Sequence, residues 1–325
     1  MELILADANG AEIRRIWDDI DIDIGDMNDF EIKIPYASWD GLITHGKRIY
    51  IPGTEFGGLV EDVRSSTATD MIYACGYTWR GYLDHKIIEP PSGQDYKTVS
   101  GELNAIIRQL VDGEFNGLIV GTEDQTSVTT TYQFDRYTTL EKGLEKMLKR
   151  VGYKLQIRYL QTDLSGYVEV SAVPIENYGD SVEISQDARL DFTSRDYRMG
   201  INHLICLGIG ELKDRVVVHL YADADGNISQ TQTFTGKDEI TATYENTTAE
   251  QEDLITGGTD RLQELANYKE FVAEMANDGD DIDLDVGDTI TGRDYITGIV
   301  VTKPIINKVV TITNGFPAVQ YKVEG

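Results

Sequence analysis

The sequence is short of several residue types, and each shortage excludes a class of protein. Its 325 residues contain two cysteines, Cys75 and Cys206, each within an apolar, strand-like run. Because no metal or redox spacing surrounds either one, we interpret both as buried free thiols of a chain that folds in a reducing cytoplasm. No apolar run approaches the roughly 18 residues that a membrane-spanning helix needs, so we predict no membrane insertion. A charge also occurs too early at the N-terminus for a signal peptide.

Basic residues are scarce as well. The chain has 29 Lys and Arg against 56 Asp and Glu, a formal net charge of -27. So acidic a chain repels nucleic acid and anionic membranes unless a local basic patch compensates. The densest basic stretch, residues 146–150, lies on a predicted helix that also carries Glu141 and Glu145. The composition therefore argues against direct reading of DNA.

Motifs for catalysis and cofactor binding are missing. The sequence has no Gly-x-Ser-x-Gly elbow, no Walker loop and no His-Glu-x-x-His motif, and Gly208-Ile-Gly210 is half a dinucleotide fingerprint without a following helix. The four histidines are scattered along the chain: His45, His85, His203 and His219. We interpret His203 and His219, which lie in predicted strands, as satisfied core or surface residues. We therefore predict a protein that is not an enzyme, with no catalytic, cofactor-binding or metal-ligating residue.

What the sequence has instead is β structure. Short segments of alternating or β-branched residues recur every eight to twelve residues in the first part, and again between residues 281 and 323. The predicted fold is mainly β with α+β parts, in which two small β-barrel domains flank an α/β satellite domain. The predicted domains are an N-terminal β-barrel (1–82), the satellite (83–181) and a second β-barrel (182–325) with an inserted helix at about 248–276.

Three helices are expected from apolar periodicity and capping residues. Ser100 caps a helix that ends at Val111, and Thr139 caps a second one that Gly152 stops. The inserted helix starts at Thr248, or at Thr259 if the Gly257-Gly258 pair breaks it.

Two groups of aspartates have the composition of calcium ligands: Asp18, Asp19, Asp21, Asp23, Asp26 and Asp29, then Asp278, Asp280, Asp281, Asp283, Asp285 and Asp288. Alternate residues on one strand lie about 6.6 Å apart, too far for one ion that needs about six to eight converging oxygens. We interpret both groups as solvated strand faces that discourage edge pairing, with calcium binding left open. The turn after Asp223 lacks the glycine and glutamate of a calcium loop.

Three segments, in this order, carry a resemblance: Asp29-Phe-Glu-Ile-Lys-Ile-Pro35, Ile72-Tyr-Ala-Cys-Gly-Tyr-Thr-Trp-Arg-Gly-Tyr-Leu83, and Leu284-Asp-Val-Gly-Asp-Thr-Ile290 followed by Gly-Ile-Val-Val. Together they resemble the hub proteins of bacteriophage tails. These are the tail-associated baseplate-hub proteins at siphophage and prophage tail tips, related in fold to the hubs of contractile tails and type VI secretion spikes. The resemblance covers essentially the whole chain.

The resemblance implies a structural virion protein made in the host bacterial cytoplasm and located in the tail. It implies a homotrimer whose barrels form a ring that adapts the tail tube to the tip and surrounds the DNA passage without specific DNA binding. The implied partners are the distal tail protein, the tape measure protein and receptor-binding parts. For such a ring we predict an acidic lumen, with Asp18–Asp29 and Asp278–Asp288 as the best candidates.

Two other classes stay open at this point. One is a tail-tip hydrolase of cell wall or polysaccharide that uses paired carboxylates, because 56 acidic residues supply many such pairs. The other is a secreted adhesin that depends on calcium.

Overall fold

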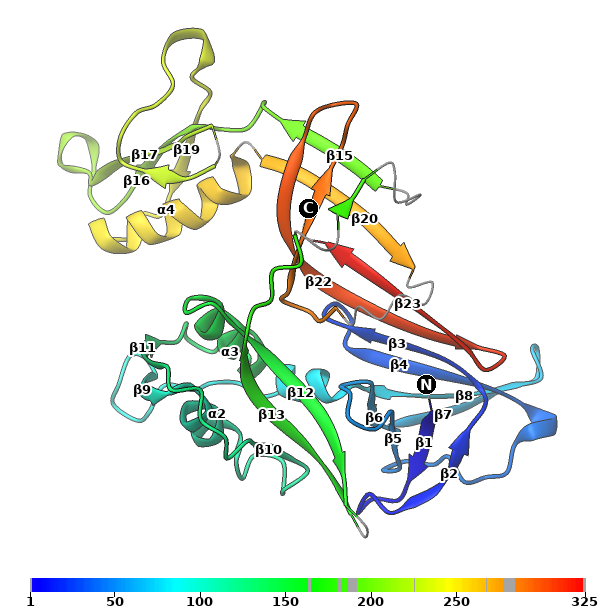
Figure 1. The fold of residues 1–325 in the computed structure, drawn as a ribbon. Coiled ribbons are helices and arrows are strands. Elements are labelled where there is room, and N and C mark those ends of the chain that lie inside the picture. Colours follow the sequence, from blue (N-terminus) through cyan, green and yellow to red (C-terminus); the bar gives the residue numbers. More distant parts are fainter. Residues whose placement is uncertain are drawn as a thin grey trace. The chain divides into compact units, whose positions relative to one another are not determined.

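The computed structural model describes residues 2–162, 165–179, 183–185, 192–224, 226–266, 268–276 and 284–323 (Figure 1). The chain is mainly β, which confirms the predicted class. Its internal contacts divide it into two compact units rather than the three predicted domains. Unit 1 comprises Met1–Asp191, Ala273–Thr291 and Thr302–Glu324, and unit 2 comprises Phe192–Val272 and Gly292–Val301. Closure of the sheets into barrels stays a prediction.

Unit 1 begins with eight strands: β1 (Leu3–Ala6), β2 (Glu12–Ile16), β3 (Asp19–Ile24), β4 (Asp29–Pro35), β5 (Arg48–Tyr50), β6 (Gly57–Leu59), β7 (Asp62–Ser66) and β8 (Met71–Tyr77). They form parts of two sheets, of order β2-β1-β5-β6 and β22-β3-β4-β8-β7. The alternation that predicted β3 also sets its burial, because Ile20, Ile22 and Ile24 are buried while the aspartates between them face the other side.

The closing strands complete the sheet that the first strands begin. They are β20 (Tyr268–Ala276), β21 (Thr289–Arg293), β22 (Val300–Thr313) and β23 (Phe316–Val323). Strand β22 pairs antiparallel with β3, with Lys308 opposite Ile24 and Ile312 opposite Ile20. The predicted boundary at 182 is therefore wrong for these strands, which join the N-terminal sheet. Leu284 and Val286 are buried as expected, but they precede β21 and lie outside any strand.

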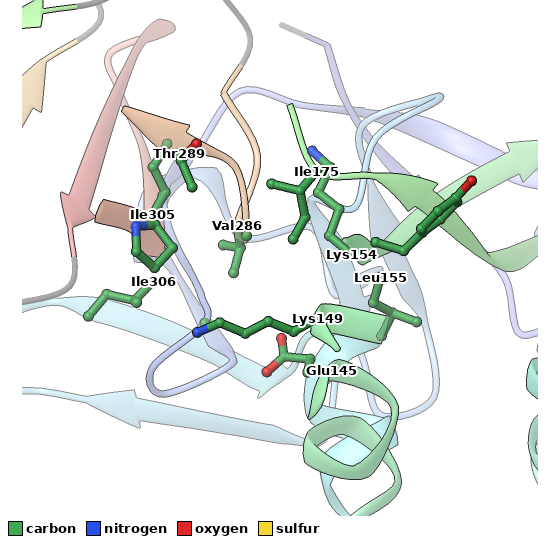
Figure 2. Close-up of a pocket in the computed structure, with 13 residues that line it drawn as sticks. Glu145, Lys149, Lys154, Leu155, Ile175, Val286, Thr289, Ile305 and Ile306 are labelled. Atoms are coloured by element: carbon green, nitrogen blue, oxygen red, sulfur yellow. The ribbon is translucent and has the colours of Figure 1, made fainter. Parts of the chain in front are cut away.

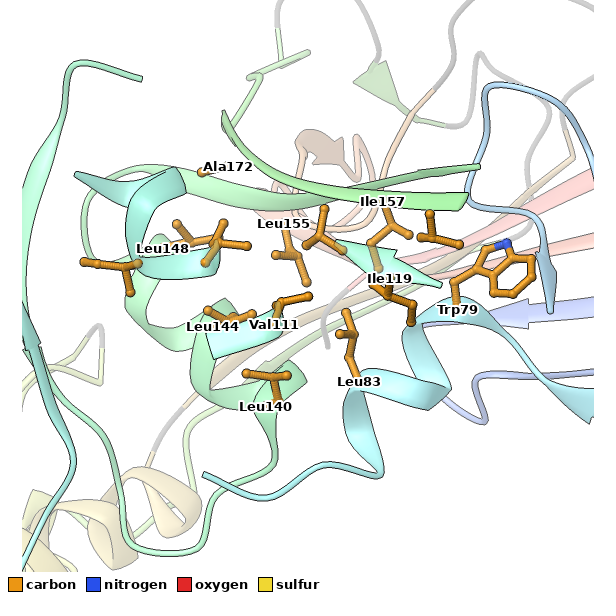
Figure 3. Packing of buried hydrophobic residues seen from close by; sticks show 14 of the residues in the cluster. Trp79, Leu83, Val111, Ile119, Leu140, Leu144, Leu148, Leu155, Ile157 and Ala172 are labelled. Atoms are coloured by element: carbon orange, nitrogen blue, oxygen red, sulfur yellow. The ribbon is translucent and has the colours of Figure 1, made fainter. Parts of the chain in front are cut away.

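The satellite part of unit 1 combines three helices with two small sheets. Its elements are α1 (Trp79–Asp84), β9 (Thr98–Glu102), α2 (Leu103–Val111), β10 (Ile119–Gly121), β11 (Thr129–Gln133), α3 (Leu140–Lys149), β12 (Tyr153–Gln161) and β13 (Gly166–Pro174). Strand β14 (Glu183–Ile184) follows them and pairs with β21. The sheet β10-β13-β12 packs against α2 and α3. Figure 3 shows Leu144 of α3 and Leu155 of β12 among the side chains of this core.

The core of the satellite continues past the predicted boundary at residue 82. Tyr159 of β12 stacks on Tyr50 of β5, with ring centroids 3.9 Å apart, and on Trp79 of α1, at 5.4 Å. All three side chains are fully buried in one cluster. The first strands and the satellite therefore share a hydrophobic core, because aromatic rings from both sides fill the same space.

Two of the predicted caps have different outcomes. Thr139 caps α3 by accepting the backbone N–H of Lys142, as predicted. Ser100 does not cap α2, because it lies in β9 opposite Thr131. The cap of α2 is Glu102, whose carboxylate accepts the Ala105 N–H at 2.9 Å. Burial acts to raise the pKa of Glu102, but its hydrogen bonds from Thr126 and Ala105 outweigh this and lower the pKa to about 2.

Unit 2 is a small sheet covered by one helix. Its elements are β15 (Phe192–Tyr197), β16 (His203–Leu207), β17 (Val217–Ala222), β18 (Ile228–Ser229), β19 (Thr241–Glu245) and α4 (Gln251–Leu265). The sheet order is β18-β17-β16-β19. Leu254 and Leu262 of α4 are buried in the core with Leu204 and Leu220 of the sheet.

The inserted helix predicted at about 248–276 is correct only in its first half. Helix α4 ends at Leu265, and Tyr268–Ala276 forms β20, whose Glu274 pairs with Lys322 of β23. An aromatic and β-branched segment with a strand partner adopts the extended form. Gly258 does not break the helix either. A Cβ there would lie 2.5 Å from the Cys206 sulfur, so the glycine lets α4 pack closely on β16.

Candidate functional site

A first cluster of charged side chains lies buried in unit 1. The Lys154 Nζ atom lies 2.6 Å from Asp288 and 3.2 Å from Asp285, and the Lys308 Nζ atom lies 3.4 Å from Asp285. The exposed fractions are 1% for Asp288, 2% for Lys308 and 8% for Lys154, whereas the Asp285 side chain at the edge of the cluster is 37% exposed. Among the described residues of this cluster, two positive and two negative charges thus compensate one another. This balanced cluster links β12, the segment before β21, and β22.

The backbone of the segment before β21 is shaped for this contact. Asp288 accepts the backbone N–H groups of Asp285, at 3.1 Å, and of Glu176, at 3.0 Å. Gly287 has a φ of +97°, and a Cβ there would lie 3.0 Å from the Lys154 Cβ atom. Only glycine adopts this conformation readily and leaves that space free. The turn therefore brings the carboxylate of Asp288 down onto Lys154.

The other lysine of the balanced cluster lies between aromatic rings. The Lys308 ammonium is 4.8 Å from the Phe56 ring centroid and 5.6 Å from that of Tyr321, within the range of cation–π attraction. Burial acts to raise the pKa of Asp285, but the ammonium groups of Lys308 and Lys154 outweigh it and lower the pKa. Asp285 is therefore held in its charged form.

A second buried cluster has unequal charges. The guanidinium of Arg80, 2% exposed, lies 3.0 Å from Glu55, 2.8 Å from Glu145 and 3.4 Å from Glu141. One positive charge therefore faces three carboxylates. Burial, and next the neighbouring Glu145, raise the pKa of Glu141 to about 7, and Arg80 opposes this only in part. This unbalanced cluster links α1 and the β5–β6 connection to α3.

A cavity of about 330 Å³ lies beside both clusters (Figure 2). Glu145 and Lys149 line it from α3, and Val286, Ile305 and Ile306 line it from the closing part of unit 1. Its walls are mainly apolar. Its size is that of a small-molecule site, but its charged side chains are already engaged or exposed, and none points to a particular ligand.

The first group of aspartates lies on or near the outer face of β3, and several of its members have structural contacts. Asp23 accepts the Met27 N–H and the Asn307 side-chain amide, both at 2.9 Å, and Asp19 accepts the Asn314 N–H at 2.8 Å. Burial, followed by the charges of Asp23 and its neighbours, raises the pKa of Asp29. Among the described residues, no three His, Cys, Asp or Glu side chains are placed to hold a metal ion.

The second group of aspartates was predicted to be a solvated strand face or part of a lumen. That prediction is wrong for Asp288, whose carboxylate is 1% exposed and paired with the buried Lys154. Asp285 also pairs with buried lysines, but its side chain is 37% exposed. The other members, Asp278, Asp280, Asp281 and Asp283, lie outside the described residues.

Two of the four histidines are brought together. His203 Nε2 lies 2.8 Å from His219 Nδ1, and His203 Nδ1 lies 2.6 Å from Glu239, so these rings are satisfied as predicted. His45 lies 3.3 Å from Glu61, and His85 packs edge-on against the Tyr77 ring.

Both cysteines are free thiols, as predicted. Cys206 is buried, whereas Cys75 is only half-buried, on the outer face of β8. Burial, followed by the charge of Glu31, raises the pKa of Cys75 to about 11. The thiol is therefore a poor nucleophile at neutral pH.

The buried cations Arg80, Lys154 and Lys308 were not predicted from the sequence. A signal was present for Lys308, which occupies an inward position in the β-branched run of residues 305–312. A charged residue at an apolar position of a strand indicates a buried partner. No comparable signal marks Arg80.

Comparison with known proteins gives a consistent answer at the level of fold. No family model and no curated protein matches the sequence. Among solved structures, the 43 kDa tail protein of prophage MuSo2 from Shewanella oneidensis matches with a TM-score of 0.60 and 15% identity, over 99% of this chain and 98% of that one. The chain has a phage tail-protein fold.

Two further structures support the phage tail-protein fold. The tail protein from Neisseria meningitidis MC58 has a TM-score of 0.55 and 11% identity, over 100% of this chain and 97% of that chain. Prophage tail protein gp18 from Listeria monocytogenes EGD-e has a TM-score of 0.51 and 12% identity, over 99% and 94%. Within the described part of the chain, no helix is long and apolar enough to cross a membrane.

Proposed function

We propose that the chain is a structural protein of a phage or prophage tail tip, a hub that adapts the tail tube to the tip and surrounds the DNA passage. The observation that carries the proposal is the match to the MuSo2 tail protein, which covers nearly all of both chains. We propose a homotrimeric ring, made in the bacterial cytoplasm and located in the virion tail. Its neighbours would be the distal tail protein, the tape measure protein and receptor-binding parts.

The two charge clusters of unit 1 suit such a protein. They bind the first strands, the satellite and the closing strands to one another through Arg80, Lys154 and Lys308. Buried ion pairs are geometrically specific, because any displacement leaves a charge without its partner in a poor solvent for ions. A ring subunit needs this property, since small errors in subunit shape accumulate around a ring.

We propose that the protein has no enzymatic activity. The three carboxylates that lie together in unit 1, Glu55, Glu141 and Glu145, surround Arg80, which is 2% exposed. A hydrolase needs two carboxyl groups on either side of a substrate, whereas here the Arg80 guanidinium lies between the three carboxylates. No observation on the described residues favours the hydrolase.

The proposal of an acidic DNA passage now depends on the first group of aspartates and on residues outside the described part of the chain. Asp21 is exposed on the outer face of β3, and Asp29 lies on the same face of β4. A negative wall would repel the duplex and keep it centred, less strongly as salt rises.

Light scattering coupled to size-exclusion chromatography tests the assembly, alone and with the distal tail protein. We expect a trimer mass, and electron microscopy of the same fraction should show a ring. A monomer under all conditions, including the mixture, would contradict the proposal.

Incubation with peptidoglycan and bacterial polysaccharides tests the proposal that the protein has no enzymatic activity. Turnover that a single carboxylate-to-amide change abolishes would overturn the non-enzymatic assignment.

A further inference from the structure

Helix α3 presents an exposed basic stripe in a chain whose net charge is -27. Lys142, Lys146 and Arg150 follow one another at intervals of four residues and are all exposed, which places them on one side of the helix. Arg136 is exposed in the segment just before the helix. Lys146 pairs with Asp135 at 2.8 Å. We call Arg136, Lys142, Lys146 and Arg150, with Tyr137, the basic stripe.

The unbalanced cluster creates this stripe. In the sequence, Glu141 and Glu145 stand among the lysines and suggest a neutral helix surface. In the structure both glutamates turn toward Arg80, at 3.4 and 2.8 Å. Arg80 thus buries the charge of Glu141, which is 6% exposed, and draws Glu145, which stays 39% exposed, toward itself, so positive charge predominates on the side of α3 that carries Lys142, Lys146 and Arg150. The segregation is a property of the fold and is not apparent from composition.

An aromatic side chain stands beside the basic stripe. Tyr137 is 58% exposed and has a φ of +56°, a left-handed conformation that is uncommon for a residue with a bulky side chain. The Arg136 guanidinium lies 5.5 Å from its ring centroid. Tyrosine and arginine are enriched at the centres of protein interfaces, and strained backbone is concentrated at functional sites. The stripe thus has the composition of a contact surface.

A complementary surface exists on the same chain. The outer face of strands β3, β4, β7 and β8 carries six acidic side chains and two basic ones: Asp19, Asp21, Asp23, Asp29, Glu31 and Asp62, with Lys33 and Arg64. Asp21 stands directly opposite Glu31 on the neighbouring strand, and the Glu31 carboxylate already pairs with Arg64 at 2.7 Å and with Lys33 at 3.6 Å, so the excess of acidic charge on this face lies with the aspartates. Tyr77 adds a ring that is 43% exposed. We call this surface the acidic face.

We propose that the basic stripe of one copy docks on the acidic face of a second copy. This inference rests on the proposed ring and identifies the surfaces that form it. It places Asp21 and Asp29 in the contact between subunits rather than on the wall of the DNA passage, so the two proposals for these aspartates exclude each other. The two surfaces differ, so the contact is head-to-tail, and such contacts generate closed rings when the rotation between subunits closes. Complementary charge would also speed the encounter and set the register. Another acidic protein bound at the stripe is the alternative that the experiment must separate.

Charge reversal tests the proposal with a matched control. Lys142→Glu with Arg150→Glu changes the stripe, and Asp21→Lys with Asp62→Lys changes the acidic face. Lys213→Glu with Lys237→Glu makes the same charge change as the stripe variant at exposed positions of unit 2. Sedimentation at several salt concentrations measures self-association. We expect each surface variant to weaken it by about tenfold or more, the control to leave it unchanged, and rising salt to weaken the wild type.

Combining the two altered surfaces in one chain is the decisive arm. Because positive and negative partners are then exchanged, association should return toward the wild-type value, which misfolding of either variant cannot produce. A wild-type ring that is unaffected by the stripe variant would overturn this contact and leave the proposed hub intact. Loss in both variants without recovery in the combined chain would also overturn it. Absence of any wild-type assembly would count against the hub itself.

Discussion

The two charge clusters of unit 1 differ in how they compensate charged side chains that are buried away from water. In the balanced cluster, Lys154 and Lys308 face Asp285 and Asp288, and the pKa of Asp285 is lowered. In the unbalanced cluster, one arginine faces three glutamates, and the pKa of Glu141 is raised to about 7. A balanced cluster retains its charges, whereas an unbalanced one takes up a proton. Ion pairs of similar length therefore have opposite dependence on pH.

Breaking the balanced cluster should have the largest effect. Lys154→Met leaves Asp288, which is 1% exposed, without its cation. We expect a loss of roughly 3–5 kcal/mol in the free energy of unfolding, measured by urea denaturation at pH 7. The control is Lys237→Met, which removes an 89% exposed partner of Asp238 and should leave the free energy of unfolding nearly unchanged. Equal losses in the two variants would contradict a special role for the buried cluster.

Neutralising the unbalanced cluster should raise stability at alkaline pH. The pKa of Glu141 lies near 7 in the folded protein against an ordinary value of 4.5. The folded state therefore holds a proton that the unfolded state has released, and stability falls as pH rises through this window. Glu141→Gln removes that dependence, so we expect the variant to exceed the wild type by up to about 3 kcal/mol at pH 8 and by little at pH 5.

Unfolding curves between pH 5 and 8 measure this difference. The control is Glu114→Gln, whose carboxylate is 54% exposed beside Lys86 and should leave the pH profile unchanged. A Glu141→Gln profile that runs parallel to the wild type would show that Glu141 is ionised throughout.

A smaller effect is expected when the shape of the cation changes and its charge is kept. Arg80 reaches three carboxylates through two nitrogens of a planar group, which a lysine ammonium cannot reproduce. We expect Arg80→Lys to lower the free energy of unfolding by about 1.5 kcal/mol, through one lost charged hydrogen bond. Arg64→Lys, at a 60% exposed pair with Glu31, should be nearly neutral in the same thermal or urea melts. A neutral Arg80→Lys would mean that charge alone matters in this cluster.

The sequence predicted the parts of the fold that depend on local pattern. The first aspartates alternate along a strand face in β3, and Thr139 caps α3, as the sequence pattern predicted. The fold class could also be predicted, because three segments in the same order along the chain resemble those of phage tail hub proteins. Local pattern is informative where the conformation of a residue depends only on its neighbours in sequence and on solvent.

The predictions were wrong where contacts with residues distant in sequence determine the secondary structure or the burial of a side chain. Residues 268–276 read as helix from their spacing, but pairing with β23 makes them a strand. Asp288 was predicted to be exposed to solvent, but it is buried in an ion pair with Lys154, which lies 134 residues away in sequence. The basic stripe was hidden because the sequence does not reveal that Glu141 and Glu145 turn toward Arg80. Each of these facts depends on a contact that no local window contains.

The pairing of β3 with β22 has a consequence for how the chain folds. The side chains of Asp23 and Asn307, joined by a hydrogen bond across these strands, are 284 residues apart in sequence. At about 5–20 residues per second of synthesis, the edge of β3 stays open for tens of seconds before β22 leaves the ribosome. Long-range pairing of this kind slows folding, and an open edge invites pairing with another chain. The alternating aspartates of β3 protect that edge during the wait, because their charge repels identical strands on neighbouring nascent chains.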